Sequence, residues 1–229
     1  MFYYYDPTYL LLIPGILLAL FAQVKMSAAF SKWKQVPSRT GLTGAQVARM
    51  ILDSNHCSEV RVERVPGSLT DHYDPQDGVL RLSDEVYASR SIAALGVAAH
   101  EAGHAIQDAQ GYLPMNLRAT LVPVANIGSH AAVPLFMLGL IFSWEPLLKI
   151  GILCFAFAVL FYLVTLPVEY NASSRATALL ASGYLPDDEV KGVKAVLSAA
   201  ALTYVAAALQ AVLQLLRLVI LANGRRRDD

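Results

Sequence analysis

Four long apolar stretches limit what this sequence can fold into. They cover Tyr9–Val24, Ala119–Trp144, Leu147–Leu166 and Val196–Ala222. A helix rises about 1.5 Å per residue and the hydrocarbon core of a bilayer is about 30 Å thick, so roughly 17–25 apolar residues can cross it. The composition agrees, because 55% of the residues are hydrophobic and only 16% are charged. We therefore predict a mainly helical integral membrane protein with about four transmembrane helices.

Charged residues beside the first stretch predict its orientation. Basic residues begin only after this stretch, at Lys25, Lys32, Lys34 and Arg39. This pattern favours an uncleaved anchor, with the aromatic residues Phe2–Tyr5 at one interface and the following loop in the cytoplasm. A fourth span would carry Arg225–Arg227 to the outer side, against the same tendency, so the exit side of the C-terminus stays open.

The polar region between the first two stretches predicts a small α+β part. Thr43 can cap a short helix that runs to Leu52. The segments Val60–Val65 and Val79–Ser83 read as strands, joined through the polar stretch Asp71–Gly78. We expect a short β-hairpin or sheet, whose open edge could hold an extended peptide by backbone pairing.

The helix expected over residues 91–109 carries the sequence His100-Glu101-Ala102-Gly103-His104, an H-E-x-x-H pattern. Residues four apart lie on one face of a helix, so His100 and His104 can bind one Zn²⁺ ion. Glu101 lies on the flank of that face, where a general base can reach a water molecule. The alternative interpretation is two surface histidines on an ordinary helix.

Glu169 is the candidate for the third metal ligand. The second and third apolar stretches form a hairpin, so the chain after Leu166 returns to the side of His100. Two histidines and one glutamate are a common ligand set for catalytic zinc, which keeps a further position for water. The competing interpretation is a carboxylate at a helix start, favoured by the helix dipole. His130 is a weaker candidate, since one carbonyl group can satisfy a neutral histidine.

These features predict five segments. They are an N-terminal anchor (1–26), a soluble α+β region with the zinc helix (27–118), a transmembrane hairpin (119–166), a third-ligand region (167–195) and a C-terminal membrane helix with a charged tail (196–229).

The net charge is zero, so nothing indicates a nucleic-acid partner. Cys57 and Cys154 lie in different surroundings, and we expect no disulfide between them. The acidic residues Asp71, Asp74 and Asp77 could hold calcium but lack the EF-hand pattern.

Four stretches of the chain resemble the neutral zinc metallopeptidases of bacterial membranes, typified by YugP-like proteins. The matching stretches are Thr70–Pro75, Val97–Gln107, Val168–Ser173 and Ala200–Leu209. The resemblance implies a single multi-pass protein of the bacterial cell (inner) membrane, with a zincin-like cytoplasmic part.

A looser likeness links the chain to the membrane gluzincins, which include the CAAX prenyl endopeptidases and heat-shock membrane proteases. Their Glu-x-x-Ala-Asp motif is matched by residues 169–173, except that Ser173 stands in place of the Asp. In those families this Asp supports a ligand histidine. The likeness implies that Glu169 is a metal ligand.

The expected function is that of a zinc-dependent endopeptidase acting on membrane or membrane-proximal proteins. Zn²⁺ would be held by His100, His104 and Glu169, with Glu101 as general base. Candidate donors to the oxyanion are His72, Tyr204, Tyr73 and Arg175, of which we expect His72 and Tyr204 to be catalytic.

Two other classes of function stay open. One is a non-hydrolytic scaffold or partner-binding protein that zinc stabilises. The other is a transporter, which only the polar residues Asn126 and His130 in the second apolar stretch suggest. The expected partners are the lipid bilayer and a protein or peptide substrate, with a membrane-protein partner or a homo-oligomer left open.

Overall fold

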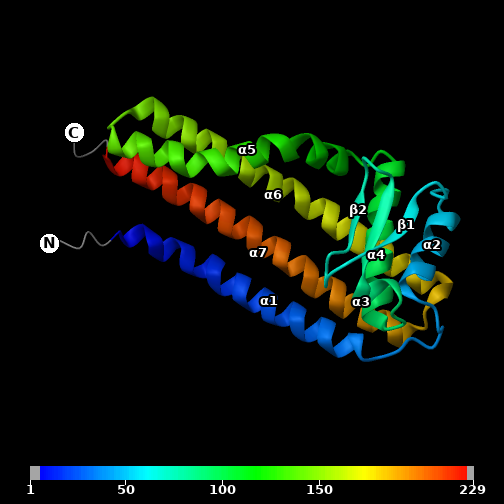
Figure 1. The fold of residues 1–229 in the computed structure, drawn as a ribbon. Helices are drawn as coiled ribbons and strands as arrows, with labels where there is room; N and C mark the ends of the chain where they lie inside the picture. Colours follow the sequence, from blue (N-terminus) through cyan, green and yellow to red (C-terminus); the bar gives the residue numbers. More distant parts are fainter. Residues whose placement is uncertain (1–5, 226–229) are drawn as a thin grey trace. The chain divides into compact units, whose positions relative to one another are not determined.

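The computed structural model describes residues 6–225. The predicted aromatic belt at Phe2–Tyr5 and the charged tail from Arg226 onward lie outside the described residues. Helices predominate, and one three-stranded sheet precedes the helix that carries the motif (Figure 1). The elements in chain order are η1 (Pro7–Leu12), α1 (Ile13–Lys34), α2 (Gly44–Ser54), β1 (Arg61–Val65), β2 (His72–Asp74), β3 (Val79–Ser83), α3 (Asp84–Tyr87), α4 (Ile92–Ala109), α5 (Leu113–Ile141), α6 (Glu145–Leu179), η2 (Leu180–Tyr184) and α7 (Asp187–Arg225).

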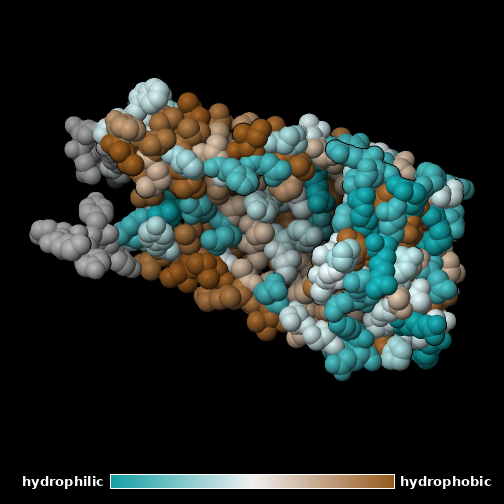
Figure 2. Space-filling view, in the orientation of Figure 1, coloured by the Kyte–Doolittle hydropathy of each residue, from teal (hydrophilic) through white to brown (hydrophobic). Residues whose placement is uncertain are grey.

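Four helical segments are long and apolar enough to cross a membrane, as the sequence predicts. They are Pro7–Lys34, Leu113–Ile141, Glu145–Tyr184 and Asp187–Gly224. Large apolar side chains on α1 and α5 are exposed, among them Leu17, Phe21 and Ile127. Figure 2 shows hydrophobic residues gathered on the surface of the long helices. Apolar surface of this kind on a folded chain marks an interaction surface, such as one that faces lipid.

Cα packing divides the chain into two compact units. The first contains residues 22–116 and 167–202, and the second contains the chain up to residue 21, residues 117–166 and the chain from residue 203. Helices α1, α5, α6 and α7 each contribute residues to both units. The motif and Glu169 both belong to the first unit.

The structure confirms the expected small sheet, but β1 and β3 do not form a hairpin. Strand β1 pairs with β3 in parallel, and β2 pairs with the other side of β3 in antiparallel orientation. The third strand, β2, lies inside the polar stretch that the sequence analysis assigned to a connection. It is three residues long and mostly polar, so it shows no alternation that a pattern could reveal. Strand β2 is one edge of the sheet.

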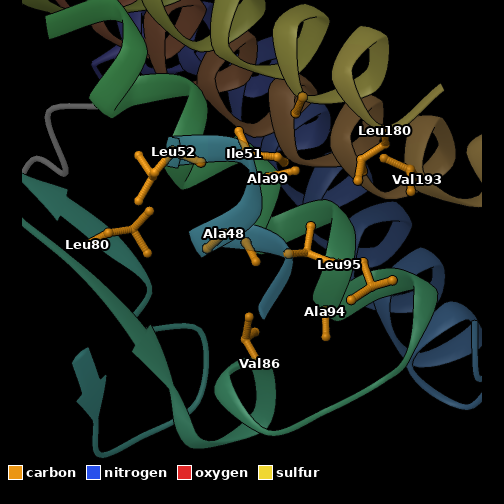
Figure 3. Close-up of a cluster of buried hydrophobic side chains, with 14 of the residues drawn as sticks. Ala48, Ile51, Leu52, Leu80, Val86, Ala94, Leu95, Ala99, Leu180 and Val193 are labelled. Carbon is orange, nitrogen blue, oxygen red and sulfur yellow. The ribbon is translucent and has the colours of Figure 1, made fainter. Parts of the chain in front are cut away.

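The core of the first unit is formed by the sheet, helices α2, α3 and α4, and residues of α6, η2 and α7 such as Leu180 and Val193 (Figure 3). Thr43 caps α2 in a reciprocal capping box with Gln46, which confirms the predicted helix start. Ile51 and Leu52 of α2 pack with Leu80 of β3 and Leu95 of α4, and all four are fully buried. This packing fixes α4 against the sheet.

Helix α6 continues through Pro167, where the sequence analysis separated a membrane span from a third-ligand region. A proline inside a helix removes one backbone hydrogen bond and kinks the helix without always ending it. Glu169 therefore lies on the same helix as the third apolar stretch. Helix α7 begins at Asp187.

Candidate metal centre

Helix α4 is positioned by its cap and by its small residues. The Ser91 hydroxyl accepts a hydrogen bond from the backbone N–H of Ala94 at 3.2 Å, which satisfies one free group of the first turn. Gly103 lies so close to α6 that a Cβ atom there would be 3.0 Å from the carbonyl oxygen of Ala172. The missing side chain lets α6 approach the motif, and Glu169 lies one turn before Ala172.

The side chains of His100, His104 and Glu169 converge, and each offers an atom that could bind a metal ion. The Nε2 atom of His100 lies 3.2 Å from Nε2 of His104 and 3.2 Å from Oε2 of Glu169. The third separation, from His104 Nε2 to Glu169 Oε2, is 3.6 Å. Among the residues from 6 to 225, this is the one group of three such side chains that gathers in this way.

These separations fit a tetrahedral zinc ion. Ligand atoms at about 2.0–2.1 Å from such an ion are about 3.3–3.4 Å from one another. The three observed separations of 3.2, 3.2 and 3.6 Å lie close to this value. The donor set of two imidazoles and one carboxylate also suits zinc. The residues present therefore fit a zinc ion in both spacing and chemistry.

The electrostatics of the group favour a positive charge. Glu169 is 2% exposed, and a buried carboxylate needs a compensating cation. Burial lowers the pKa of His104, but hydrogen bonding to Glu169 and the negative charges of Glu101 and Glu169 raise it, and the net shift is upward. The carboxylates thus outweigh desolvation and make the site attractive to a cation.

Glu101 lies beside this group with its carboxylate uncommitted. The residue is 9% exposed, and within the described chain its side chain makes no hydrogen bond or ion pair. A carboxylate without a fixed partner can accept a proton from a water molecule nearby. Its position is consistent with the predicted general base.

Gln107 determines which nitrogen of His104 carries the proton. The Nε2 amide group of Gln107 donates to the carbonyl oxygen of Val168 and to Oδ1 of Asn171, both at 2.9 Å. A backbone carbonyl can only accept, so the amide orientation is fixed and its Oε1 atom faces Nδ1 of His104 at 3.0 Å. That oxygen can only accept as well. Nδ1 of His104 must therefore carry the hydrogen, which leaves the Nε2 lone pair for a metal.

Arg175 fixes the other end of this chain of hydrogen bonds. Its guanidinium donates from Nε to Oδ1 of Asn171 at 2.7 Å and from Nη1 to Oε1 of Gln110 at 2.7 Å. Because arginine has no acceptor, the Asn171 oxygen must point toward it. The sequence analysis missed Gln107 and Asn171. The available signal was a glutamine three residues after His104, on nearly the same helix face.

Ser173 lies behind the other histidine, where the family likeness places a supporting residue. Its hydroxyl is 3.1 Å from Nδ1 of His100. A hydroxyl can donate or accept, so this contact orients the ring without fixing its tautomer. The two histidines are thus supported differently, His104 by an amide of fixed orientation and His100 by a hydroxyl.

The predicted oxyanion donors lie in different surroundings. The Tyr73 hydroxyl donates to Asp108 at 2.8 Å, and burial together with this acceptor raises its pKa. The Tyr73 hydrogen is thus committed to Asp108, whereas Arg175 uses only Nε and Nη1 in the amide chain described above and has further N–H groups. His72 lies exposed on β2 with Nδ1 2.8 Å from the carbonyl of Thr70. Tyr204 lies on α7 in the second unit, and the roles of His72 and Tyr204 stay predictions.

Two weaker metal candidates have other partners. Nδ1 of His130 is 2.7 Å from the carbonyl of Asn126, one turn earlier, as expected for a histidine satisfied by its own helix. In the acidic stretch considered for calcium, the carboxylates of Asp74 and Asp77 both accept hydrogen bonds from Arg81.

Asp71 accepts hydrogen bonds from the backbone N–H and hydroxyl of Ser83, at 2.7 and 3.0 Å. Burial raises its pKa, and the charge of Glu101 raises it further. Within residues 6–225, these acidic side chains are not part of a group that converges on a possible metal position, so nothing supports the calcium alternative.

Comparison with known proteins assigns the family. Residues 8–223 match the protein family described as "Putative neutral zinc metallopeptidase". The chain belongs to this family. It is also 49% identical over 217 residues to the "Putative membrane protease YugP" of Bacillus subtilis (strain 168), a match that covers 94% of this chain and 96% of that protein. No solved structure matches the chain. The resemblance inferred from sequence is confirmed, and with it zinc as the metal of this family.

Proposed function

We propose that this protein is a membrane-embedded zinc endopeptidase in which His100, His104 and Glu169 hold the metal. The observation that carries the proposal is the convergence of these three side chains at separations suited to tetrahedral zinc. Family membership supports a peptidase, and the related Bacillus subtilis protein is named a membrane protease. The ligand roles of the individual residues are our assignment.

The residues around the metal would divide the chemistry among them. When bound, zinc acts as a Lewis acid and lowers the pKa of a water molecule toward about 7. Glu101 takes the proton from that water and can return it to the leaving amine. Gln107 holds His104 in the tautomer that presents Nε2, and Ser173 orients His100. His72 and Tyr204 are the candidate donors to the developing oxyanion.

Strand β2 offers a place for the substrate backbone. It is an edge of the sheet, and the Tyr73 hydroxyl ties it to Asp108 on α4, the helix of the motif. An edge strand presents unpaired N–H and C=O groups to which an extended peptide can add. We infer that the substrate binds as an extended segment along β2.

The membrane location rests on the four apolar helical segments and on the name of the relative. We propose that they cross the bacterial cell membrane and that the unit containing residues 22–116 and 167–202 faces the cytoplasm. Lys25, Lys32 and Lys34 after the first apolar stretch favour this orientation. Labelling of single cysteines placed at Arg61 and at Ser143 with a membrane-impermeant reagent in intact cells tests it. Labelling at Arg61 would contradict the cytoplasmic assignment.

The decisive experiment compares two variants for metal content and hydrolysis. Glu101→Gln should keep zinc while hydrolysis of casein or a quenched peptide falls about 10²- to 10⁴-fold, the usual contribution of a general base. Glu169→Ala should lose zinc occupancy as well as activity. Unchanged zinc content in Glu169→Ala would contradict the ligand assignment.

The same experiment separates the peptidase from a zinc-stabilised scaffold. Structural zinc sites are usually closed by four protein ligands, often thiolates. The described group has three candidate ligands and a carboxylate without a fixed partner beside it, which favours an open site. If the wild-type protein binds zinc and hydrolyses no peptide under any condition in which it is folded, the result would favour a zinc-stabilised scaffold over a peptidase.

A further inference from the structure

The first unit contains a groove of about 710 Å³ between α6 and the start of α7, on the Nδ1 side of His100. Ser173 lines it, but the atoms that converge on the metal position face the other way, since Nε2 of His100 points to Glu169. None of His100, His104 and Glu169 is among the residues that line the groove, and the proposed function assigns it no role.

The charge of this groove is positive. Lys191 and Lys194 lie three residues apart on α7, so their side chains are neighbours on one helix face. Both are exposed, and neither forms an ion pair with any residue from 6 to 225. No acidic residue lines the groove. The acidic residues Asp188 and Glu189 at the start of α7 bind Arg39 instead.

The remainder of the lining is small and largely apolar. Ala178 and Ala181 come from the α6 side, and Leu197 and Ala201 come from α7. The hydroxyls of Thr177 and Ser198 donate to carbonyl groups of their own helices. The two ammonium groups are thus the strongest donors that the groove presents. A fitting occupant carries a negative group for the lysines and an apolar part for the alanine-lined walls.

Resting on the membrane location proposed above, the sequence positions of the lining residues put the groove near the ends of two apolar stretches, where lipid headgroups would lie. Tyr170, which is 51% exposed, follows the end of the third apolar stretch at Leu166 by four residues, or about 6 Å of helix. Lys194 precedes the last apolar stretch, which begins at Val196, by two residues. Exposed tyrosines and lysines at such boundaries are typical of the membrane interface.

We propose that this groove binds one anionic phospholipid, with its phosphate at Lys191 and Lys194 and the start of its acyl chains along the alanine-lined walls. A lipid fits better than an acidic peptide because both walls are helices. Their backbone N–H and C=O groups are already paired, so they offer few partners to a peptide backbone.

The test measures lipid retention on the purified full-length protein in an uncharged detergent. Native mass spectrometry compares phosphatidylglycerol with phosphatidylcholine of the same acyl chains. We expect phosphatidylglycerol to bind preferentially and Lys191→Gln/Lys194→Gln to weaken its binding about 30-fold, which corresponds to about 1 kcal/mol per lysine. The matched control Arg61→Gln/Arg64→Gln, two exposed arginines of β1, removes the same charge and should leave lipid binding unchanged.

A second variant separates the shape of the groove from its charge. Ala178→Phe keeps both lysines but fills the apolar wall, and it should also lower phosphatidylglycerol binding. Equal binding of the two lipids by the wild type would overturn the proposal, as would unchanged phosphatidylglycerol binding by the lysine variant. Displacement of the lipid by an acidic peptide would equally overturn it. None of these readouts depends on zinc or on hydrolysis, so the peptidase assignment can fail without affecting the result.

Discussion

Replacing Gln107 by methionine should weaken zinc binding without removing a ligand. Gln107 is fully buried, and its Oε1 atom is the acceptor that faces Nδ1 of His104. Methionine has a similar volume but no comparable acceptor. In the metal-free variant, His104 can move its hydrogen to Nε2 and donate to Glu169. Zinc binding would have to reverse this and leave a buried N–H without a partner.

The size of the effect follows from that unpaired group. A buried donor without an acceptor costs about 1–3 kcal/mol. Since every 1.4 kcal/mol is a factor of ten, the zinc dissociation constant should rise about 5- to 150-fold. This range overlaps the 10- to 100-fold loss that is typical when the hydrogen-bond partner of a ligand histidine is removed.

Gln107→Glu provides the sharper comparison. A carboxyl oxygen can still accept from Nδ1 of His104, so the zinc dissociation constant should stay near that of the wild type. An ionised carboxylate cannot donate to the carbonyl of Val168, and the folded protein should lose about 1–3 kcal/mol of unfolding free energy. The two substitutions thus separate support of the metal ligand from support of the fold. Gln110→Met is the matched control, because Gln110 contacts Arg175 at the exposed end of the chain and should leave zinc affinity unchanged.

Two measurements check this reasoning. Competition with a chelating dye of known zinc affinity gives the dissociation constants for the detergent-solubilised variants. Nitrogen-15 NMR of histidine-labelled, metal-free protein reports the tautomer of His104, which should carry its hydrogen on Nδ1 in the wild type and in Gln107→Glu. Equal zinc affinity in the wild type and Gln107→Met would refute the tautomer argument, as would a neutral His104 in the wild type with its hydrogen on Nε2.

Gly103→Ala should lower zinc affinity, because a Cβ atom 3.0 Å from the carbonyl oxygen of Ala172 would push back the helix that carries Glu169. The helix-propensity gain of about 1 kcal/mol offsets part of an overpacking cost of about 1–3 kcal/mol, so zinc titration is a clearer readout than stability. Asp71→Asn should gain stability relative to the wild type as the pH rises. The pKa of Asp71 is higher in the folded protein than in the unfolded chain. The unfolding free energy of the wild type therefore falls as the pH rises from about 4 to the folded pKa. Denaturant titrations at several pH values measure this loss. Chelation of zinc should lower the unfolding temperature and readdition should restore it, since a ligand at 100 times its dissociation constant contributes about 2.7 kcal/mol. An unchanged unfolding temperature after chelation would argue against a folded-state zinc site.

The sequence was most informative where local spacing decides the structure. Two histidines four residues apart must share a helix face, and the cap at Thr43 was predicted from one residue and its neighbours. The apolar stretches likewise predicted the helices long enough to span a membrane. These features depend on interactions within a few residues, which a sequence pattern records.

The remaining features depend on contacts between distant segments. The parallel pairing of β1 with β3 needs a connection that returns the chain to the same end of the sheet, and the three residues of β2 inside that connection carry no pattern of their own. The partners of Gln107 lie 61 and 64 positions away, at Val168 and Asn171. The boundary placed between residues 166 and 167 lies inside one helix, because the backbone hydrogen bond lost at Pro167 did not outweigh the helix on either side.

The origin of the candidate metal site in α4 and α6 has a consequence for biosynthesis. Glu169 follows His100 by 69 residues, so at about 5–20 residues per second a ribosome reaches it roughly 3–14 s later. During this interval the nascent chain has both imidazoles of the motif but lacks the carboxylate that we assign to the metal. The newborn polypeptide would therefore remain without a complete catalytic centre until the hairpin of α5 and α6 has been synthesised and has folded back.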